Sequence, residues 1–225
     1  MLAAAAACEV ELPSREFYDA LWKEIPPGLE PYRFGPRLRF LRAHVGGGER
    51  VLDLGCGEGR FSAELLALGA EVLAVDVAEE PLRRARASVP GLQTALIDPD
   101  GPWELAAGGF DVVWAGEVIA HVADTSAWIA ELCRVLRPGG RLVLSTRALD
   151  RAELLFEALT PGFSSEGGRF DPRADDLRFY SARTLRALLL DSGFDAVEVR
   201  REGSLLQAAR GGRLLLAAAR LSPRP

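Results

Sequence analysis

The sequence is poor in cysteine, has no excess of basic residues and contains no long apolar run. Its three cysteines are scattered and form no CxxC pair, which argues against a disulfide framework or a structural zinc site. A formal net charge of -5 gives no electrostatic support to a nucleic-acid partner. No apolar stretch approaches the roughly 18 residues of a membrane span, and the first residues lack the basic start of a secretory signal. We therefore expect a cytoplasmic protein with no nucleic-acid or membrane partner.

Strand and helix patterns alternate along most of the chain, with no internal repeat. Such alternation implies right-handed crossovers and a mostly parallel sheet covered on both faces, so we predict a Rossmann-like α/β fold. The RPGG segment at 137–140 is interpreted as a turn before a strand. The expected strands are 50–55, 71–76, 92–97, 110–116, 141–146, 194–202 and 211–221, and the expected helices are 13–24, 33–45, 59–69, 79–87, 125–136 and 181–193.

The domain organisation is predicted from where the alternation starts and where it is interrupted. Residues 1–48 are expected to form an N-terminal helical cap, and residues 49–225 one Rossmann-like domain. The stretch at about 150–178 is rich in Gly, Pro, Ser and acids. It is long for a connection without regular structure, which indicates a lid-like insertion.

A glycine-rich turn links the first strand of the alternating region to its helix. Gly55 and Gly57 follow that strand directly, and glycines let the backbone turn tightly and approach a ligand. Asp76 ends the next strand, where folds of this class place a carboxylate for ribose hydroxyls. The pattern therefore predicts a nucleoside ligand at the carboxyl ends of the strands.

The turn matches neither of two common phosphate-binding signatures. The dinucleotide motif GxGxxG is absent because Arg60 stands at its last position, and no GK[ST] of a P-loop follows. Asp53 and Glu58 flank the turn; acids would oppose a pyrophosphate but suit a ligand with a sulfonium and an ammonium group. Arg60 could offset one of these acids.

Four segments in order carry a resemblance to a known family: VLDLGCGEG, AVDVAEE, FDVVWAGEVIAHV and RVLRPGGRLVLST. Together they resemble the class I S-adenosylmethionine-dependent methyltransferases, most nearly the ubiquinone-biosynthesis O-methyltransferases, over about residues 30–200. The resemblance implies a seven-stranded sheet whose last strand is antiparallel. It also implies S-adenosylmethionine as cofactor and transfer of its methyl group to oxygen, nitrogen or carbon of a small-molecule acceptor.

The resemblance further implies which residues contact the cofactor. Arg33, in the segment PYRFG, would grip the cofactor carboxylate, and Asp98 is preferred to Asp100 as the acid near the adenine amine because it directly follows the strand. The remaining assignments are Asp53, Gly55 and Gly57 along the methionine part, Asp76 at the ribose, Val77 against the adenine, and Gly116 and Glu117 beside the methionine and sulfonium. Cys56, between the two glycines, is also expected to contact the cofactor, as a small space-filling residue and not as a nucleophile.

His121 is the candidate general base, because histidine titrates near neutrality. The alternative is that it caps or packs at the start of the next helix. The ubiquinone-type enzymes carry a Glu-x-x-Glu-His arrangement associated with a divalent metal; this chain has Glu117, Ala120 and His121, and a hard cation prefers more oxygen ligands. We therefore expect no metal. The competing functions are a nicotinamide-dependent oxidoreductase and a non-catalytic S-adenosylmethionine-binding module.

Overall fold

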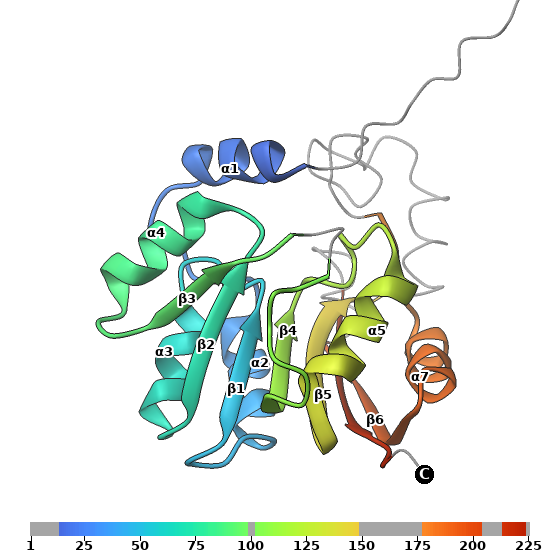
Figure 1. Cartoon of the computed structure of the whole chain (residues 1–225). Helices are drawn as coiled ribbons and strands as arrows, with labels where there is room; N and C mark the ends of the chain where they lie inside the picture. Colours follow the sequence, from blue (N-terminus) through green and yellow to red (C-terminus); the bar gives the residue numbers. More distant parts are fainter. Residues whose placement is uncertain (1–13, 99–101, 149–176, 204–212, 224–225) are drawn as a thin grey trace, which may run out of the picture.

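The computed structural model describes residues 14–98, 102–148, 177–203 and 213–223, and its centre is one seven-stranded sheet (Figure 1). The strand order is β3-β2-β1-β4-β5-β7-β6, and β7 is antiparallel to both of its neighbours while the other pairs are parallel. The predicted fold class and the antiparallel last strand are confirmed. The strands are β1 Arg50–Leu54, β2 Glu71–Asp76, β3 Gln93–Leu96, β4 Phe110–Gly116, β5 Leu136–Arg147, β6 Phe194–Glu202 and β7 Leu214–Leu221.

Helices cover both faces of the sheet, because each buried strand points alternate side chains to opposite sides. In β1, Leu52 and Leu54 belong to one core cluster and Val51 to the other. The first cluster includes residues of α5 and α7, and the second includes residues of α2, α3 and α4. The helix bounds are α1 Arg15–Glu24, α2 Phe34–Arg42, α3 Arg60–Ala67, α4 Glu79–Ser88, α5 Thr125–Val135 and α7 Ala182–Asp191.

The start of β5 differs from the expectation. The strand begins at Leu136 and includes residues 137–140, which were expected to form a turn before it. Leu136 pairs with Phe110 and Arg141 with Val112, so residues 137–140 stand opposite Asp111 alone. Gly139, with φ of 75°, supplies the left-handed conformation that such a bulge needs. The RPGG segment is thus an irregularity inside a long strand.

The first helix, α1, lies outside the two core clusters and across one end of the sheet (Figure 1). Its N-cap is Ser14, whose side chain accepts a hydrogen bond from the amide of Phe17. None of its residues is buried, whereas α2 contributes the buried Phe40 and Leu41 to the core. α1 therefore packs on the surface of the domain and adds no fully buried side chain to the core.

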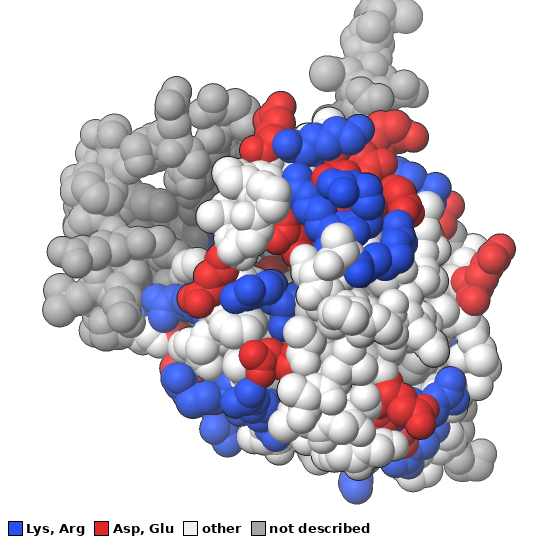
Figure 2. Space-filling view, turned by 90° about the vertical axis from the view of Figure 1, so that its left-hand side faces the viewer, with Lys and Arg blue, Asp and Glu red and all other residues white. Residues whose placement is uncertain are grey.

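Charged side chains of both signs lie next to each other on the face that carries α3 and α4 (Figure 2). Exposed ion pairs on α4, such as Arg86 with Glu79, belong to this mixed surface. In the described part of the chain, no helix has the length and apolar character needed to cross a membrane. The domain boundary at 48/49 stays a prediction, and most of the expected insertion lies outside the described residues, as do residues 1–13.

Candidate functional site

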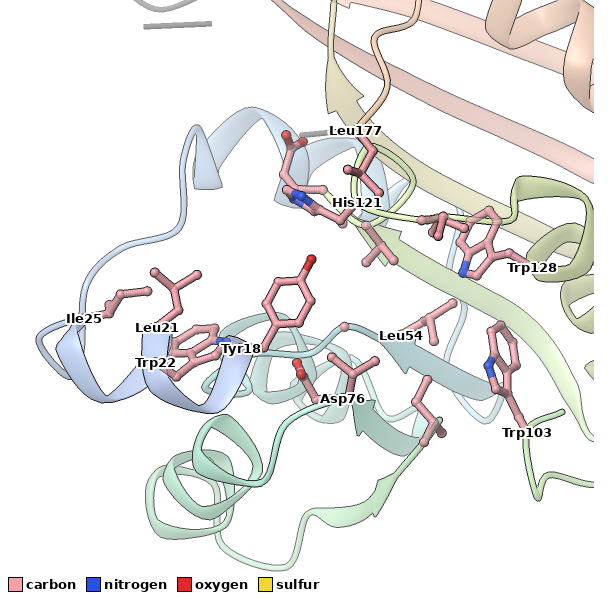
Figure 3. Close-up of a pocket in the computed structure, with 18 residues that line it drawn as sticks. Tyr18, Leu21, Trp22, Ile25, Leu54, Asp76, Trp103, His121, Trp128 and Leu177 are labelled. Carbon is pink, nitrogen blue, oxygen red and sulfur yellow. The ribbon is translucent and has the colours of Figure 1, made fainter. Parts of the chain in front are cut away.

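A cleft opens where the carboxyl ends of β1, β2 and β4 meet, at the point where the strand order reverses. Two adjoining cavities, of about 320 and 300 Å³, form it, and each matches the lower end of small-molecule pockets. Side chains of α1 line one side and the loop after β4 lines the other (Figure 3). The two cavities share the walls formed by Trp22, Ile25, Gly55, Gly116 and Glu117, so we treat them as one cleft.

The glycine turn forms the floor of the cleft. Gly55 and Gly57 have φ of 69° and 53°, which favours glycine. A Cβ atom on Gly55 would lie 2.5 Å from Cγ2 of Val118, and one on Gly57 would lie 3.0 Å from Cη2 of Trp22. Cys56, between them, lines the smaller cavity, and burial raises the pKa of its thiol. The thiol therefore stays protonated and fills space.

Asp76 faces the larger cavity beside Val77 (Figure 3). The amide of Gly57 donates to its Oδ2 at 3.0 Å, and the amide of Ala78 donates to its Oδ1 at 3.2 Å. These bonds fix the orientation of the carboxylate, while burial raises its pKa to about 6. The carboxylate keeps unused lone pairs for a ligand. It lies where the sequence predicts a ribose-binding acid.

Three other predicted cofactor residues do not line the described cleft: Asp53, Asp98 and Arg33. Asp53 is only 1% exposed and accepts a 2.6 Å hydrogen bond from the hydroxyl of Ser62 on α3. Burial raises its pKa to about 7. Arg33 precedes α2 in the left-handed conformation and donates from Nε to the hydroxyl of Tyr32 at 3.0 Å. Their roles as cofactor ligands stay predictions.

Sequence reasoning missed Arg37, which lines the smaller cavity. It is 3% exposed, and its guanidinium lies 4.6 Å from the ring centre of Phe61. Its Nη1 donates to the carbonyl of Tyr32 at 3.1 Å, but the buried Nε has no hydrogen-bond partner among the described residues. Burial lowers its pKa, an effect that Glu117 and Asp53 oppose. The sequence places Arg37 four residues after Arg33 in the predicted helix 33–45, but this spacing does not indicate which of the two faces the cleft.

Glu117 stands at the junction of the two cavities in a strained backbone conformation. Its φ is 65°, which costs free energy for a residue other than glycine and is typical of functional positions. The hydroxyl of Ser145 donates to its Oε1 at 2.7 Å, and its amide donates to the carbonyl of Ser145 at 2.9 Å. Gly116, just before it, lets the backbone pass the Trp114 ring, since a Cβ there would lie 2.8 Å from Cζ2.

His121 lies in the turn between β4 and α5 and faces the larger cavity (Figure 3). Asp124 caps α5 by accepting hydrogen bonds from the amides of Ser126 and Ala127, so His121 is not the cap. Leu177 also lines this cavity. Its amide donates to the carbonyl of Ala120 at 2.8 Å, which holds its segment beside the loop that carries His121. Tyr18 reaches into the cavity from α1 on the opposite side (Figure 3).

The acids around the glycine turn differ from the expectation in one respect. Glu58 lies beside the turn but pairs with the guanidinium of Arg84 at 2.8 Å. Arg84, and not Arg60, therefore offsets this acid. In the described ranges, no group of three or more His, Cys, Asp or Glu side chains could hold a metal ion.

Comparison with known proteins places this architecture in a family. The family model described as "Methyltransferase domain" matches residues 22–199. The ubiquinone biosynthesis O-methyltransferase of Xanthomonas oryzae pv. oryzae is 39% identical over 133 residues, which is 56% of this chain and 54% of that protein. The human mitochondrial ubiquinone biosynthesis O-methyltransferase is 29% identical over 161 residues, covering 68% and 43% of the two chains. The chain thus spans about half the length of the curated relatives it matches.

Solved structures show the same fold. An S-adenosylmethionine-dependent methyltransferase from Mesorhizobium loti aligns with a TM-score of 0.61 and 28% identity over 82% of this chain and 96% of that one. The 1,6-didemethyltoxoflavin-N1-methyltransferase of Burkholderia thailandensis aligns with a TM-score of 0.62 and 23% identity over 84% and 77%, a likeness of fold alone. Because the family model covers most of the sequence, including the glycine turn and Asp76, the chain belongs to the methyltransferase domain family.

Proposed function

We propose that the chain is an S-adenosylmethionine-dependent methyltransferase that acts on a small-molecule acceptor. One observation carries the proposal: the Asp76 carboxylate is oriented by two backbone amides at the edge of a cleft whose floor is the glycine turn. The name of the Mesorhizobium loti relative supports the same cofactor. The described cysteines, Cys56 and Cys133, are free, which suits action in a reducing compartment such as the cytoplasm.

The two cavities suggest how the cofactor would be divided. The ribose hydroxyls would bind Asp76, and the adenine would pack against Val77 and Ile97 in the larger, mostly apolar cavity. The methionine part would then cross Gly55 into the smaller cavity. There the buried cation of Arg37 would bind its carboxylate, since a charge-assisted pair satisfies the unpartnered Nε.

The charge of Glu117, between the two cavities, suits the positively charged groups of the cofactor. Glu117 lies between the cavities, and an anion there favours an ammonium or sulfonium group. Bound S-adenosylmethionine supplies a methyl group on sulfonium that an acceptor atom attacks in line. The chain therefore has to align the acceptor and exclude water. Tyr18 from α1 and Leu177 and His121 from the facing wall line the part of the larger cavity where an acceptor would approach. His121 would accept the acceptor's proton where the attacking atom carries one.

Binding of S-adenosylhomocysteine, the product form of the cofactor, tests the proposal directly. We expect micromolar affinity in the natural chain, and a loss of at least about tenfold in Asp76→Ala because a charge-assisted hydrogen bond is removed. Asp195→Ala is the matched control, since Asp195 is an acid on β6 paired with Arg220, away from the cleft. An affinity that is equal in all three proteins would refute the site.

The two competing functions give different results in the same assay. A nicotinamide oxidoreductase would bind NADH in preference to S-adenosylhomocysteine. A non-catalytic module would bind the cofactor but release no S-adenosylhomocysteine when S-adenosylmethionine and a pool of small-molecule extracts are supplied. We expect labelled methyl groups to appear in a small molecule of such a pool, and mass spectrometry of the labelled product would identify the acceptor.

A further inference from the structure

Hydrogen bonds between α1 and α4 help to hold α1 over the cleft. Arg84, on α4, is 8% exposed. Its Nη1 donates to the carbonyl of Ile25 at 2.9 Å, and its Nη2 donates to the carbonyl of Trp22 at 2.5 Å. These are carbonyls at the C-terminal end of α1, where a cation is favoured by the helix dipole. A single guanidinium thus caps the end of α1.

Glu58 connects this cap to the glycine turn. It is 9% exposed, and its Oε1 accepts from Nη1 of Arg84 at 2.8 Å. Its Oε2 accepts from the amide of Gly28 at 2.8 Å. One carboxylate therefore ties the segment after α1 to the loop that forms the cleft floor. The remaining nitrogen, Nε of Arg84, donates to Glu80 at 2.8 Å.

The two helices interact at both ends. Asp19 of α1 accepts from the amide of Glu80 in the first turn of α4, at 2.9 Å, while Arg84 donates to the end of α1. Each helix thus supplies a charge of the sign that the other's dipole favours. No residue of α1 is fully buried, so these polar contacts add to the packing of Trp22 on Gly57 in holding the helix.

What α1 contributes to the cleft follows from its position. Trp22 lines both cavities and packs on Gly57, and Tyr18 and Leu21 line the larger cavity. We propose that Arg84 and Glu58 form a latch that fixes α1 over the cleft, and that these two positioning residues control how fast ligands leave. The control of ligand release rests on the proposed function, whereas the fixing of α1 by the latch does not.

The sequence offers an unusual probe of the latch, because Lys23 is its sole lysine. It is exposed and lies in the last turn of α1. A lysine-specific endoprotease can cut the chain only after this residue, and a helical bond is cut only when the helix opens locally. The rate of this single cleavage therefore reports the opening of α1, with or without ligand.

Neighbouring arginines give a matched pair of variants. Arg83 and Arg84 both pair with Glu80, but the Arg83 side chain is 62% exposed and forms no hydrogen bond or ion pair with the described residues of α1. In the ligand-free protein we expect Arg84→Gln to accelerate cleavage after Lys23 by about tenfold, the loss expected for charge-assisted hydrogen bonds. Arg83→Gln should stay within about twofold of the natural chain, as for an exposed pair.

Arg84→Gln leaves Glu58 buried without its cation, which could unfold the chain as a whole. The double variant Glu58→Gln/Arg84→Gln removes both charges and keeps the core clusters intact, so it serves as the second test. It should show the same accelerated cleavage while its circular dichroism and cooperative thermal transition persist. Equal cleavage rates in the natural chain, the double variant and Arg83→Gln would overturn the latch.

The rate of ligand release also tests the latch, because residues that only stabilise the fold would leave this rate unchanged. S-adenosylhomocysteine should slow cleavage of the natural chain, and its dissociation rate should rise by about tenfold in the folded double variant, with a smaller change in the association rate. A dissociation rate that stays unchanged in that variant would overturn the link between latch and cleft. If the ligand protects no protein, including the natural chain, the proposed function fails, and the ligand-free cleavage rates still decide the latch.

Discussion

Asp76 has to be ionised to accept hydrogen bonds from two ribose hydroxyls, yet its burial raises the pKa to about 6. Protons therefore compete with the ligand in mildly acidic solution. We expect the affinity for S-adenosylhomocysteine to be constant above about pH 7 and to fall below about pH 6, with a limiting slope of about tenfold per pH unit. Titration calorimetry across this range would measure it.

The control for this prediction keeps the shape of the side chain and removes its titration. Asp76→Asn should bind weakly at every pH, and its affinity should lose the dependence seen in the natural chain. If the steep decline persists in the amide variant, another group titrates in the cleft, and the assignment of the ribose to Asp76 is wrong.

Arg37 and Arg33 are the two alternative candidates for binding the cofactor carboxylate. Arg37 is buried beside the glycine turn, whereas Arg33 lies outside the described cleft. We expect Arg37→Met to weaken S-adenosylhomocysteine by about 10- to 100-fold, since hydrogen bonds to charged groups contribute about 1.5–3 kcal/mol, and Arg33→Met to change it little.

A smaller ligand separates loss of the contact from loss of the fold in this experiment. 5′-Methylthioadenosine has the adenosine and sulfur but neither carboxylate nor ammonium. Its affinity should be equal in Arg37→Met and the natural chain. A parallel loss for both ligands would show that Arg37 acts on the structure of the cleft, and a larger effect of Arg33→Met would restore the assignment made from the family resemblance.

These two arginines show what sequence reasoning could reach at the residue scale. Gly55, Gly57 and Asp76 were placed at the cleft from local spacing alone, because the ends of neighbouring parallel strands meet at one edge. The side chain of an arginine before or within α2 is different. Its direction depends on the left-handed residue that precedes the helix and on the helix face that packs on α3. The spacing of residues in the sequence predicts neither of these.

At the scale of elements, the glycine turn and α1 depend on each other. A methyl group on Gly57 would lie 3.0 and 3.1 Å from the Trp22 ring, so the ring, or α1 with it, would have to shift. We expect Gly57→Ala to weaken S-adenosylhomocysteine by about tenfold, which is about 1.4 kcal/mol, and to accelerate cleavage after Lys23.

Gly91→Ala is the control for the backbone strain. Gly91 has φ of 79°, but a Cβ atom there would meet nothing within 4 Å. Both variants should lose about 1–2 kcal/mol of stability from the left-handed conformation, and only Gly57→Ala should affect α1. Equal ligand affinities in the two variants would mean that Trp22 adapts without moving the helix.

Most elements were predictable because their periodicity is local and strong. The strands β2, β4 and β6 have the predicted bounds. The start of β5 was not predicted, since Pro and two glycines suggest a turn, and only pairing with β4 extends the strand to Leu136. The Glu58–Arg84 pair was not predicted for a similar reason: its members lie 26 residues apart, and they meet only once α4 has packed beside the glycine turn.

At the scale of the whole molecule, the cleft lies between the carboxyl ends of the strands and α1. The sheet edge carries the buried carboxylates Asp53 and Asp76, and both have raised pKa values because burial disfavours the charged form. The free protein is thus less stable than it would be with neutral side chains at these positions. Such a cost at a cleft is typical of a site prepared for a ligand.

The same two groups make the stability of the free protein depend on pH. Burial raises the pKa of Asp53 from 3.8 to about 7. The folded state therefore holds a proton that the unfolded state releases, and the free energy of unfolding falls as the pH rises from about 4 to about 7. One proton sets a limit of about 1.4 kcal/mol per pH unit to this slope.

Asp53→Asn isolates this contribution, because its amide oxygen can still accept the hydrogen bond from Ser62. Urea unfolding of the ligand-free variant should show a smaller decline in the free energy of unfolding than the natural chain between about pH 5 and 7, so that the variant is the more stable protein at neutral pH.

Acids whose pKa is lowered in the folded state, such as Asp111 and Glu131, act in the opposite direction and below this pH range, since their stabilisation is lost only as the pH falls. A variant whose decline matches the natural chain would show that Asp53 is ionised in the folded protein and that its attraction to Arg37 outweighs its burial.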